Sequence, residues 1–358
     1  IRRPPRSTPL YSSAASDVYK RQNKIWPKQN LDSWIEQIKK ENPNLEIAQA
    51  DRKIDDAITV KAFPFYTDGL MASTIHSDSF PFKPWKCGIH IQLSDAKQNN
   101  EFLLHALKNG ADYISLECNL SMDGDYLDIL LHTIQLDLIT SHWNVYDDTT
   151  AHEIETYILL NHPGSEFYIN HITGDFSEKA KHLFVSLPTY NSISWTKALS
   201  TLFNFLSKTN LTSEKLIISI NLGHDFLVNV ASVRALKLLL RQFETVFQIN
   251  LNPHFALTID PSVMDDSINS NLISLSSIAL SAALSSPDVI ILPSSDQALE
   301  NKNKKWLRTS VHLLQILQHE AFLNQTPDPL SGSYSIENLT EQIAEHLWNS
   351  IQLSLNYD

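Results

Sequence analysis

The sequence has little glycine and cysteine, and it lacks several short motifs that carry common chemistry. Its 358 residues include only eight glycines, and they are scattered singly, so neither a phosphate-cradling loop nor a dinucleotide-binding fingerprint can be formed. Two cysteines, Cys87 and Cys118, cannot build a disulfide framework, and neither Cys-x-x-Cys nor His-Glu-x-x-His occurs. Because no signal peptide is readable either, these absences predict a cytoplasmic protein without the usual nucleotide or zinc motifs.

Basic residues and long apolar runs are also scarce. The chain has 28 Lys and Arg against 40 Asp and Glu, a net charge of −12, which argues against nucleic acid or an anionic membrane as a partner. No apolar run approaches the roughly 20 residues that a membrane-spanning helix needs. With 42% hydrophobic residues, the chain can bury a large core, so we expect one barrel-sized domain or two ordinary ones.

The first 22 residues differ from the rest of the chain. They are rich in Arg, Pro and Ser, have no apolar period, and resemble a translated sequencing adapter ending in Asp17-Val18-Tyr19-Lys20-Arg21-Gln22. An Arg-rich targeting peptide is the alternative, although such peptides have an apolar helical face. We expect residues 1–22 to take no part in the fold.

Residues 23–84 are predicted to form an arm before the main body. Leu31–Lys40 has the apolar spacing of a short helix, and Ile58–Leu70 is an extended piece broken by proline. The arm also contains many aromatic residues outside the strand-like runs (Trp26, Trp34, Phe63, Phe65, Tyr66, Phe80 and Phe82). Two interpretations remain open: the arm faces a partner, or it covers one end of the body.

Eight short apolar runs of strand length follow, and most are separated by stretches with the 3.6-residue period of a helix. The runs are Cys87–Leu93, Tyr113–Cys118, Leu138–Asn144, Phe167–Ile172, Leu183–Leu187, Leu216–Leu222, Phe255–Ile259 and Val289–Leu292. Such alternation implies parallel strands joined by right-handed crossovers, and eight is the number at which the sheet closes. The predicted fold is therefore an α/β protein of the (β/α)8 TIM-type barrel class over residues 85–325. A doubly wound open sheet is the alternative.

Polar residues near the ends of these runs are candidates for a site, because active sites of such barrels lie at the C-terminal ends of the strands. They are Glu117, His142, His171, Asn221 and His224. No pair of them has a recognisable nucleophile-base or metal-ligand spacing. A structural role remains the simpler interpretation for each, as for Asp225, which is predicted to cap the helix that begins at Phe226.

Residues 326–358 are predicted to be a crossing followed by a docked helix. The crossing contains Asp328-Pro329-Leu330-Ser331-Gly332-Ser333-Tyr334, which resembles the Asp-Pro-Leu-Gly-Gly-Ser-Tyr segment that closes the barrel of methylmalonyl-CoA mutases. Two further residues match motifs of that family. Arg234 lies in a segment similar to the family's Leu-Arg-Ala-Ala, and Asn271 lies in a later predicted helix. The resemblance extends from about Trp85 to Trp348 and is strongest in its last third.

Several departures fall on functional positions of the family. Catalytic chains follow the first-strand Trp with Tyr-Ala-Gly-Phe, whereas Trp85 is followed by Lys86-Cys87-Gly88. No histidine stands in an Asp-x-His-x-x-Gly cobalt-ligand loop. The resemblance therefore implies the small, non-catalytic subunit of a heterodimeric mutase that interconverts succinyl-CoA and methylmalonyl-CoA. Adenosylcobalamin and the acyl-CoA substrate would be bound by the methylmalonyl-CoA mutase large (catalytic) subunit, and no catalytic, cofactor or metal residue is expected here.

Two other functions remain open on sequence grounds. One is an active acyl-CoA mutase barrel of altered specificity, with its cobalamin domain on another chain. The other is an unrelated TIM-barrel enzyme or binding protein.

Overall fold

The computed structural model describes residues 30–46, 50–62, 84–172, 182–208, 215–293, 304–326 and 328–356. Residues 1–22 lie outside the described residues, as does most of the extended piece predicted over Ile58–Leu70. Among the arm aromatics named above, only Trp34 lies within them.

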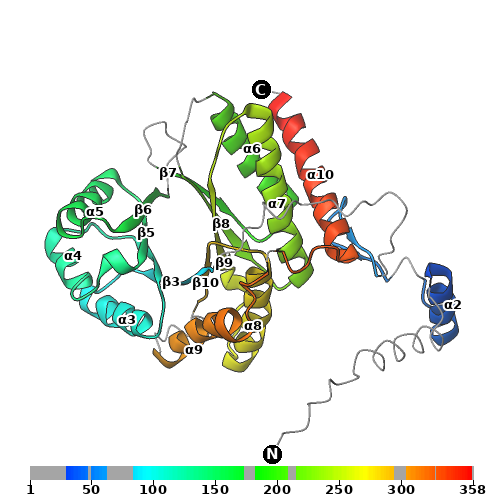
Figure 1. Cartoon of the computed structure of the whole chain (residues 1–358), viewed down its shortest axis with the longest axis horizontal. Coiled ribbons are helices and arrows are strands. Elements are labelled where there is room, and N and C mark those ends of the chain that lie inside the picture. Colours follow the sequence, from blue (N-terminus) through cyan, green and yellow to red (C-terminus); the bar gives the residue numbers. More distant parts are fainter. Residues whose placement is uncertain are drawn as a thin grey trace, which may run out of the picture.

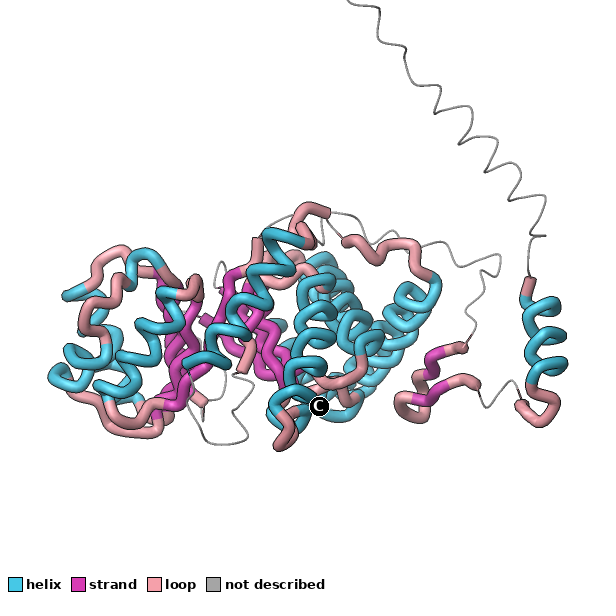
Figure 2. Tube along the Cα trace, turned by 90° about the horizontal axis from the view of Figure 1, so that it is seen from below, coloured by secondary structure: helices cyan, strands magenta, loops and turns pink. Residues whose placement is uncertain are grey.

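The centre of the molecule is a sheet of eight parallel strands (Figures 1 and 2). The strands are β3 (Lys86–Gln92), β4 (Tyr113–Cys118), β5 (Thr140–Val145), β6 (Glu166–His171), β7 (His182–Leu187), β8 (Lys215–Leu222), β9 (Pro253–Ile259) and β10 (Val289–Ile291). Their order is β6-β5-β4-β3-β10-β9-β8-β7, so the first strand of the series pairs with the last. Each predicted run overlaps one of these strands, with boundaries that differ by at most two residues.

The sheet curls until its two outer strands meet. No hydrogen-bonded ladder joins β6 to β7 within the part of the chain that the structure describes. The rings of Tyr168 on β6 and His182 on β7 nevertheless lie edge to face with centroids 5.1 Å apart. The predicted α/β barrel is therefore confirmed in a nearly closed form, and the open-sheet alternative is wrong.

Helices surround the sheet on its outer side (Figure 1). They are α3 (Ala96–Lys108), α4 (Gly124–Leu130), α5 (Asp148–Asn161), α6 (Ser192–Lys208), α7 (Phe226–Phe247), α8 (Ile268–Leu284), α9 (Lys304–Gln315), which continues into a π-helical turn at Ile316–Glu320, and α10 (Tyr334–Asn356). Short 3₁₀ turns occur at Leu136–Leu138 and Pro261–Val263. As predicted, the Asp225 carboxylate caps α7 by accepting the amide hydrogen of Val228 at 3.2 Å.

Alternation along the strands separates two environments. On β4, Ile114, Leu116 and Cys118 join the buried cluster shared with the covering helices, whereas Tyr113 belongs to a separate buried cluster with Val289. Because successive side chains of a strand point to opposite faces, Tyr113, Ser115 and Glu117 must point into the barrel. The interior is therefore lined by different side chains from those that pack the helices.

The arm meets the barrel through a small hairpin. Its strands β1 (Arg52–Lys53) and β2 (Thr59–Val60) pair antiparallel. The side chain of Gln342 on α10 accepts the Thr59 amide hydrogen at 3.0 Å and donates to the Thr59 carbonyl at 3.1 Å. The arm helix α2 (Leu31–Glu41) contributes no buried residue and lies away from the barrel in Figure 1. Part of the arm thus packs on the outside of this chain.

Gly88 lies where β3 and β10 pack closely together. A Cβ atom there would lie 2.6 Å from Ile291 Cγ1 and 3.1 Å from the Ile290 carbonyl oxygen. We expect Gly88→Ala to lower the free energy of unfolding by about 1–3 kcal/mol through overpacking, measured by urea denaturation. Gly124→Ala is the matched control, because nothing lies within 4 Å of its added Cβ. Equal stability of the Gly88 variant and the natural chain would contradict the expectation.

Candidate functional site

An ion pair lies near the N-terminal end of the barrel interior. Lys86 Nζ is 2.7 Å from Glu166 Oε2, and the hydroxyl of Thr140 donates to the same carboxylate at 2.7 Å. The Tyr168 hydroxyl donates to its other oxygen, and burial, followed by the Glu166 contact, raises the pKa of Tyr168. This end of the barrel is therefore held by a polar network that joins β3, β5 and β6.

Aromatic and imidazole rings fill the middle of the barrel. His142 stacks on Phe184 with ring centroids 5.0 Å apart, and its Nδ1 is 3.1 Å from the hydroxyl of Tyr113. Burial, followed by the effect of nearby His90, His254 and His182, lowers the pKa of His142 to about 3. His142 is therefore a neutral side chain of the packed interior, not a residue of the barrel mouth as the sequence suggested.

Above this layer, at the C-terminal end of the strands, three side chains from β3 and β4 meet. His90 Nδ1 is 3.2 Å from Ser115 Oγ, and His90 Nε2 is 3.5 Å from Glu117 Oε2. Strand pairing places His90 opposite Ser115. The exposed Tyr146 donates a hydrogen bond of 2.9 Å to the other oxygen of Glu117. We call Ser115, His90, Glu117 and Tyr146 the mouth network.

The charge of the mouth network is set by Glu117. The hydrogen bond from His90 is the largest of several effects that together hold the pKa of Glu117 below its ordinary value. The side chain is about a quarter exposed, and its carboxylate is ionised at neutral pH. An ionised carboxylate can only accept hydrogen bonds, so it fixes the orientation of donors such as His90 and Tyr146.

Two asparagines extend the network along the neighbouring strands. Asn144 on β5 donates to Ser115 Oγ at 3.4 Å, and Asn170 on β6 donates to the Asn144 side-chain oxygen at 2.8 Å. This second bond fixes which end of the Asn144 amide faces Ser115. The polar residues of four successive strands, β3 to β6, are thereby connected at the mouth.

The other predicted mouth residues have different contacts. His171 ends β6 but points outward, and its Nδ1 is 3.2 Å from Asp148 at the start of α5. Asn221 lies on β8 and accepts a hydrogen bond from Thr258 of β9. His224 is exposed in the loop that follows β8. The structure therefore connects only Glu117, of the five predicted candidates, to the mouth network.

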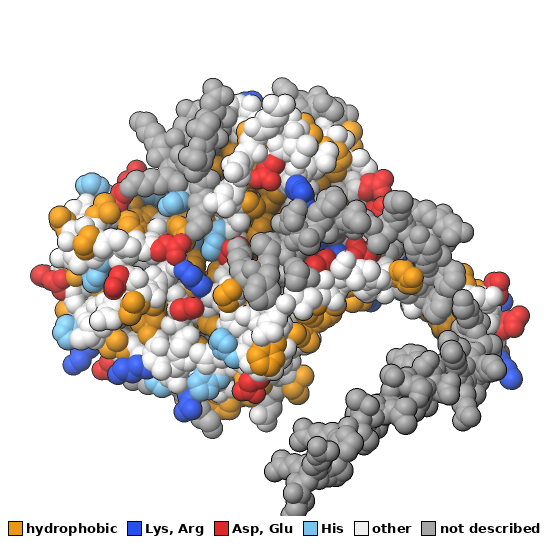
Figure 3. Space-filling model, in the orientation of Figure 1, with side chains coloured by type: hydrophobic (Ala, Val, Ile, Leu, Met, Phe, Trp, Pro, Cys, Tyr) orange, Lys and Arg blue, Asp and Glu red, His pale blue; other side chains and the backbone are white. Residues whose placement is uncertain are grey.

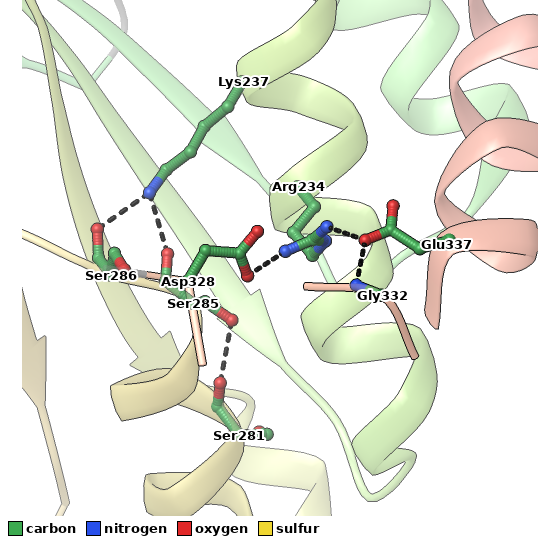
Figure 4. A network of polar contacts seen from close by, with 8 residues as sticks. All are labelled: Arg234, Lys237, Ser281, Ser285, Ser286, Asp328, Gly332 and Glu337. Carbon is green, nitrogen blue, oxygen red and sulfur yellow. Dashed lines mark hydrogen bonds and ion pairs between the residues drawn. The ribbon is translucent and has the colours of Figure 1, made fainter. Parts of the chain in front are cut away.

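The residues that carry the sequence motifs form a different site, on the outside of the barrel (Figure 4). Arg234 of α7 is fully buried and forms ion pairs with Asp328 and with Glu337 Oε1, the latter at 2.9 Å. The same Glu337 oxygen accepts the amide hydrogen of Gly332 at 3.0 Å. One guanidinium group thus fastens α7, the crossing and α10 together.

The crossing itself is a compact turn. The amides of Ser331 and Ser333 donate to the carbonyls of Asp328 and Leu330, each at 3.1 Å. Gly332 has a φ of +80°, in the left-handed region that favours glycine. Pro329 and Tyr334 are exposed at its surface. The motif therefore shapes and anchors the segment that leads into α10.

Lys237 and the motif residue Asn271 support the same end of the fold. Lys237 donates to the carbonyls of Ser285 and Ser286, both at 2.8 Å, at the end of α8. Asn271 bonds both backbone groups of Asp265, each at 2.8 Å, and so fixes the loop before α8. These contacts are structural, because Lys237 satisfies carbonyls that the end of α8 leaves unpaired and Asn271 satisfies backbone groups of the loop before α8.

The described residues contain no group of three or more His, Cys, Asp or Glu that could hold a metal ion. Within the same described ranges, no helix is long and apolar enough to cross a membrane. On the face shown in Figure 3, acidic and basic side chains are scattered without a large patch of one sign.

The fold and these sites define a parallel α/β barrel with a polar mouth and a buried clamp between its last helices. Residues 207–353 match the family model described as Methylmalonyl-CoA mutase, which supports the family resemblance over the last part of the chain. The matched range starts well after Trp85, where the resemblance was expected to begin. It contains Arg234 and all the residues of Figure 4, whereas the mouth network lies outside it.

Individual relatives show the same partial match. Methylmalonyl-CoA mutase of Rhizobium meliloti (strain 1021) is 29% identical over 137 residues, which is 37% of this chain and 19% of that protein. Methylmalonyl-CoA mutase of Escherichia coli (strain K12) is 31% identical over 136 residues, with the same coverage. The chain thus spans about a fifth of the length of the curated relatives it matches.

Solved structures with a similar fold include the DHPS of Yersinia pestis with a pterine-sulfa conjugate. The likeness has a TM-score of 0.43 and 12% identity, and it covers 67% of this chain and 95% of that one. A dihydropteroate synthase of Coxiella burnetii in complex with pteroic acid gives a TM-score of 0.40 at 13% identity, covering 67% and 95% of the two chains.

Sequence reasoning did not identify His90, Ser115 or Tyr146 as site residues. His90 and Ser115 lie inside predicted strands, whereas the predicted candidates lie at strand ends. One signal could have identified His90 and Ser115: both occupy alternate positions that face the barrel interior. In strands that are buried on both faces, this alternation is hidden because most positions are apolar.

Proposed function

We propose that this chain is the non-catalytic small subunit of a heterodimeric, adenosylcobalamin-dependent methylmalonyl-CoA mutase. The observation that carries the proposal is where the family-like residues lie. Arg234, Asp328 and Glu337 form a buried clamp that holds helices together, and Lys237 and Asn271 brace the ends of loops and helices. Family resemblance in this chain therefore falls on its scaffold.

The barrel interior supports the same proposal. In the family, the barrel is the place where substrate is held, with a tyrosine from the first strand above it. Here the first strand carries Lys86, which is paired with Glu166, and the middle of the barrel is occupied by Tyr113, His142 and Phe184. An acyl-CoA passing along the barrel axis would collide with these rings.

Adenosylcobalamin would supply radical chemistry when bound to the catalytic chain. The mouth of this barrel does not fit the cofactor, because both ring nitrogens of His90 are engaged, by Ser115 and by Glu117. His171 is turned toward α5. We assign the cofactor to the partner, and no step of the mutase reaction to residues of this chain.

Co-expression with a methylmalonyl-CoA mutase large subunit from the same genome tests the proposal. We expect a stable one-to-one complex by size-exclusion chromatography with light scattering, since obligate interfaces bury roughly 2,000 Å² or more. Methylmalonyl-CoA should be converted, with added adenosylcobalamin, by the complex and not by this chain alone. Turnover by the chain without a large subunit would favour an active mutase barrel, and failure to form any complex would favour an unrelated barrel protein.

A further inference from the structure

The contacts of the mouth network specify the position of each proton. Glu117 is ionised and can only accept, so the proton between it and His90 belongs to His90 Nε2. A neutral imidazole with a proton on Nε2 has an acceptor at Nδ1. Asn144 donates to Ser115 Oγ, and this leaves the Ser115 hydroxyl hydrogen to point at His90 Nδ1, 3.2 Å away.

This order of donors is that of a nucleophile, a base and an orienting acid. The base accepts the hydroxyl proton of the serine, and the carboxylate holds the correct tautomer and stabilises the imidazolium that forms. The two ring nitrogens have exchanged roles relative to the triad of serine proteases, but the order of hydrogen bonds from serine to histidine to carboxylate is the same. We propose that Ser115, His90 and Glu117 form an acyl-transfer triad that hydrolyses activated esters and thioesters of small acyl groups.

The surrounding residues limit the substrate and stabilise the reaction. Ser115 is 5% exposed, so we expect only a small acyl group to reach its hydroxyl. His90 and Glu117 are 38% and 27% exposed, so the leaving group can extend into solvent. The Asn144 side-chain amide, held by Asn170, can donate to the oxyanion that develops beside Ser115.

The reaction proceeds in two balanced halves. Ser115 Oγ forms a bond to the acyl carbon while its proton moves to His90 Nδ1. The carbon–oxygen or carbon–sulfur bond then breaks, and the leaving alkoxide or thiolate takes that proton. Water attacks the acyl-serine, gives a proton to His90, and releases the carboxylic acid as the proton returns to Ser115 Oγ. Ester or thioester plus water thus gives acid plus alcohol or thiol, without an added oxidant or reductant.

The test uses the purified full chain with p-nitrophenyl acetate as substrate and a fluorophosphonate as a covalent probe. We expect hydrolysis above the buffer rate and a single fluorophosphonate adduct on the peptide that contains Ser115, located by mass spectrometry. Ser115→Ala should lose the adduct, and both Ser115→Ala and His90→Gln should lower the hydrolysis rate by about 10²-fold or more. Ser219→Ala, at a half-buried position of β8, is the control and should react as the natural chain does.

Glu117 is tested as a positioning residue. Glu117→Gln should lower kcat with little change in KM, because the carboxylate acts on His90 and not on the bound ester. The proposal is overturned if the natural chain forms no adduct at Ser115, or if Ser115→Ala hydrolyses the ester as fast as the natural chain. The adduct test uses only the natural chain, so its result remains decisive even if a variant fails to fold. The measurement is also independent of whether the chain pairs with a mutase subunit.

Discussion

Replacing Arg234 by methionine is expected to lower the free energy of unfolding by about 3–5 kcal/mol, because it leaves buried carboxylates without their cation. Arg234 is 0% exposed, and its partners Asp328 and Glu337 are 7% and 7% exposed. Methionine fills much of the volume of the arginine stem. The lost stability therefore reflects mainly the removed charge and less the removed packing. Urea denaturation at neutral pH gives the value.

Two further variants separate the clamp from general effects on α7. Arg241→Met changes an exposed arginine on the same helix and should alter stability by less than about 1 kcal/mol. Adding Asp328→Asn and Glu337→Gln to Arg234→Met removes the uncompensated charges and should recover part of the loss. If the triple variant is no more stable than Arg234→Met, uncompensated charge is not the reason for the loss.

Acidification is expected to destabilise the fold through His142. Its pKa is lowered to about 3 in the folded chain, whereas an unfolded histidine titrates near pH 6.5, so below about pH 6.5 the unfolded state binds the extra proton. The contribution of His142 to stability is complete above that value and falls as pH drops toward 3, by on the order of 1 kcal/mol per pH unit. Other titrating groups also change the free energy of unfolding with pH. The contribution of His142 is therefore measured as the difference in that free energy between the natural chain and a His142 variant.

His142→Phe removes the pH-dependent contribution of His142 to stability. The variant should lose about 1–2 kcal/mol at neutral pH, because the Tyr113 hydroxyl loses its partner, and the gap to the natural chain should close or reverse as pH falls. Urea denaturation at several pH values between 4 and 7.5 measures it. His224→Gln, at an exposed position, is the control and should keep the acid sensitivity of the natural chain. Parallel loss of stability by His142→Phe and the natural chain would contradict a buried, neutral His142.

Much of the barrel was determined by local sequence. Apolar runs of strand length and the 3.6-residue period predicted all eight strands and the helices between them, since each element buries one face and its residues are neighbours in sequence. The Asp225 cap was predictable for the same reason, because donor and acceptor are three residues apart. Motif spacing likewise identified Arg234 and the Asp328 crossing as related to the mutase family before their contact was known.

Which side of each strand faces the interior was decided by closure of the barrel. His142 and His171 lie near strand ends in the sequence, yet one is stacked on Phe184 in the interior and the other contacts α5. Register between strands, fixed only when parallel neighbours pair, brings His90 beside Ser115. The Arg234 clamp joins residues separated by 94 and 103 positions. Sequence alone determined the elements because their stabilising contacts are local, whereas only the tertiary structure could place these side chains together, since their partners lie on other elements.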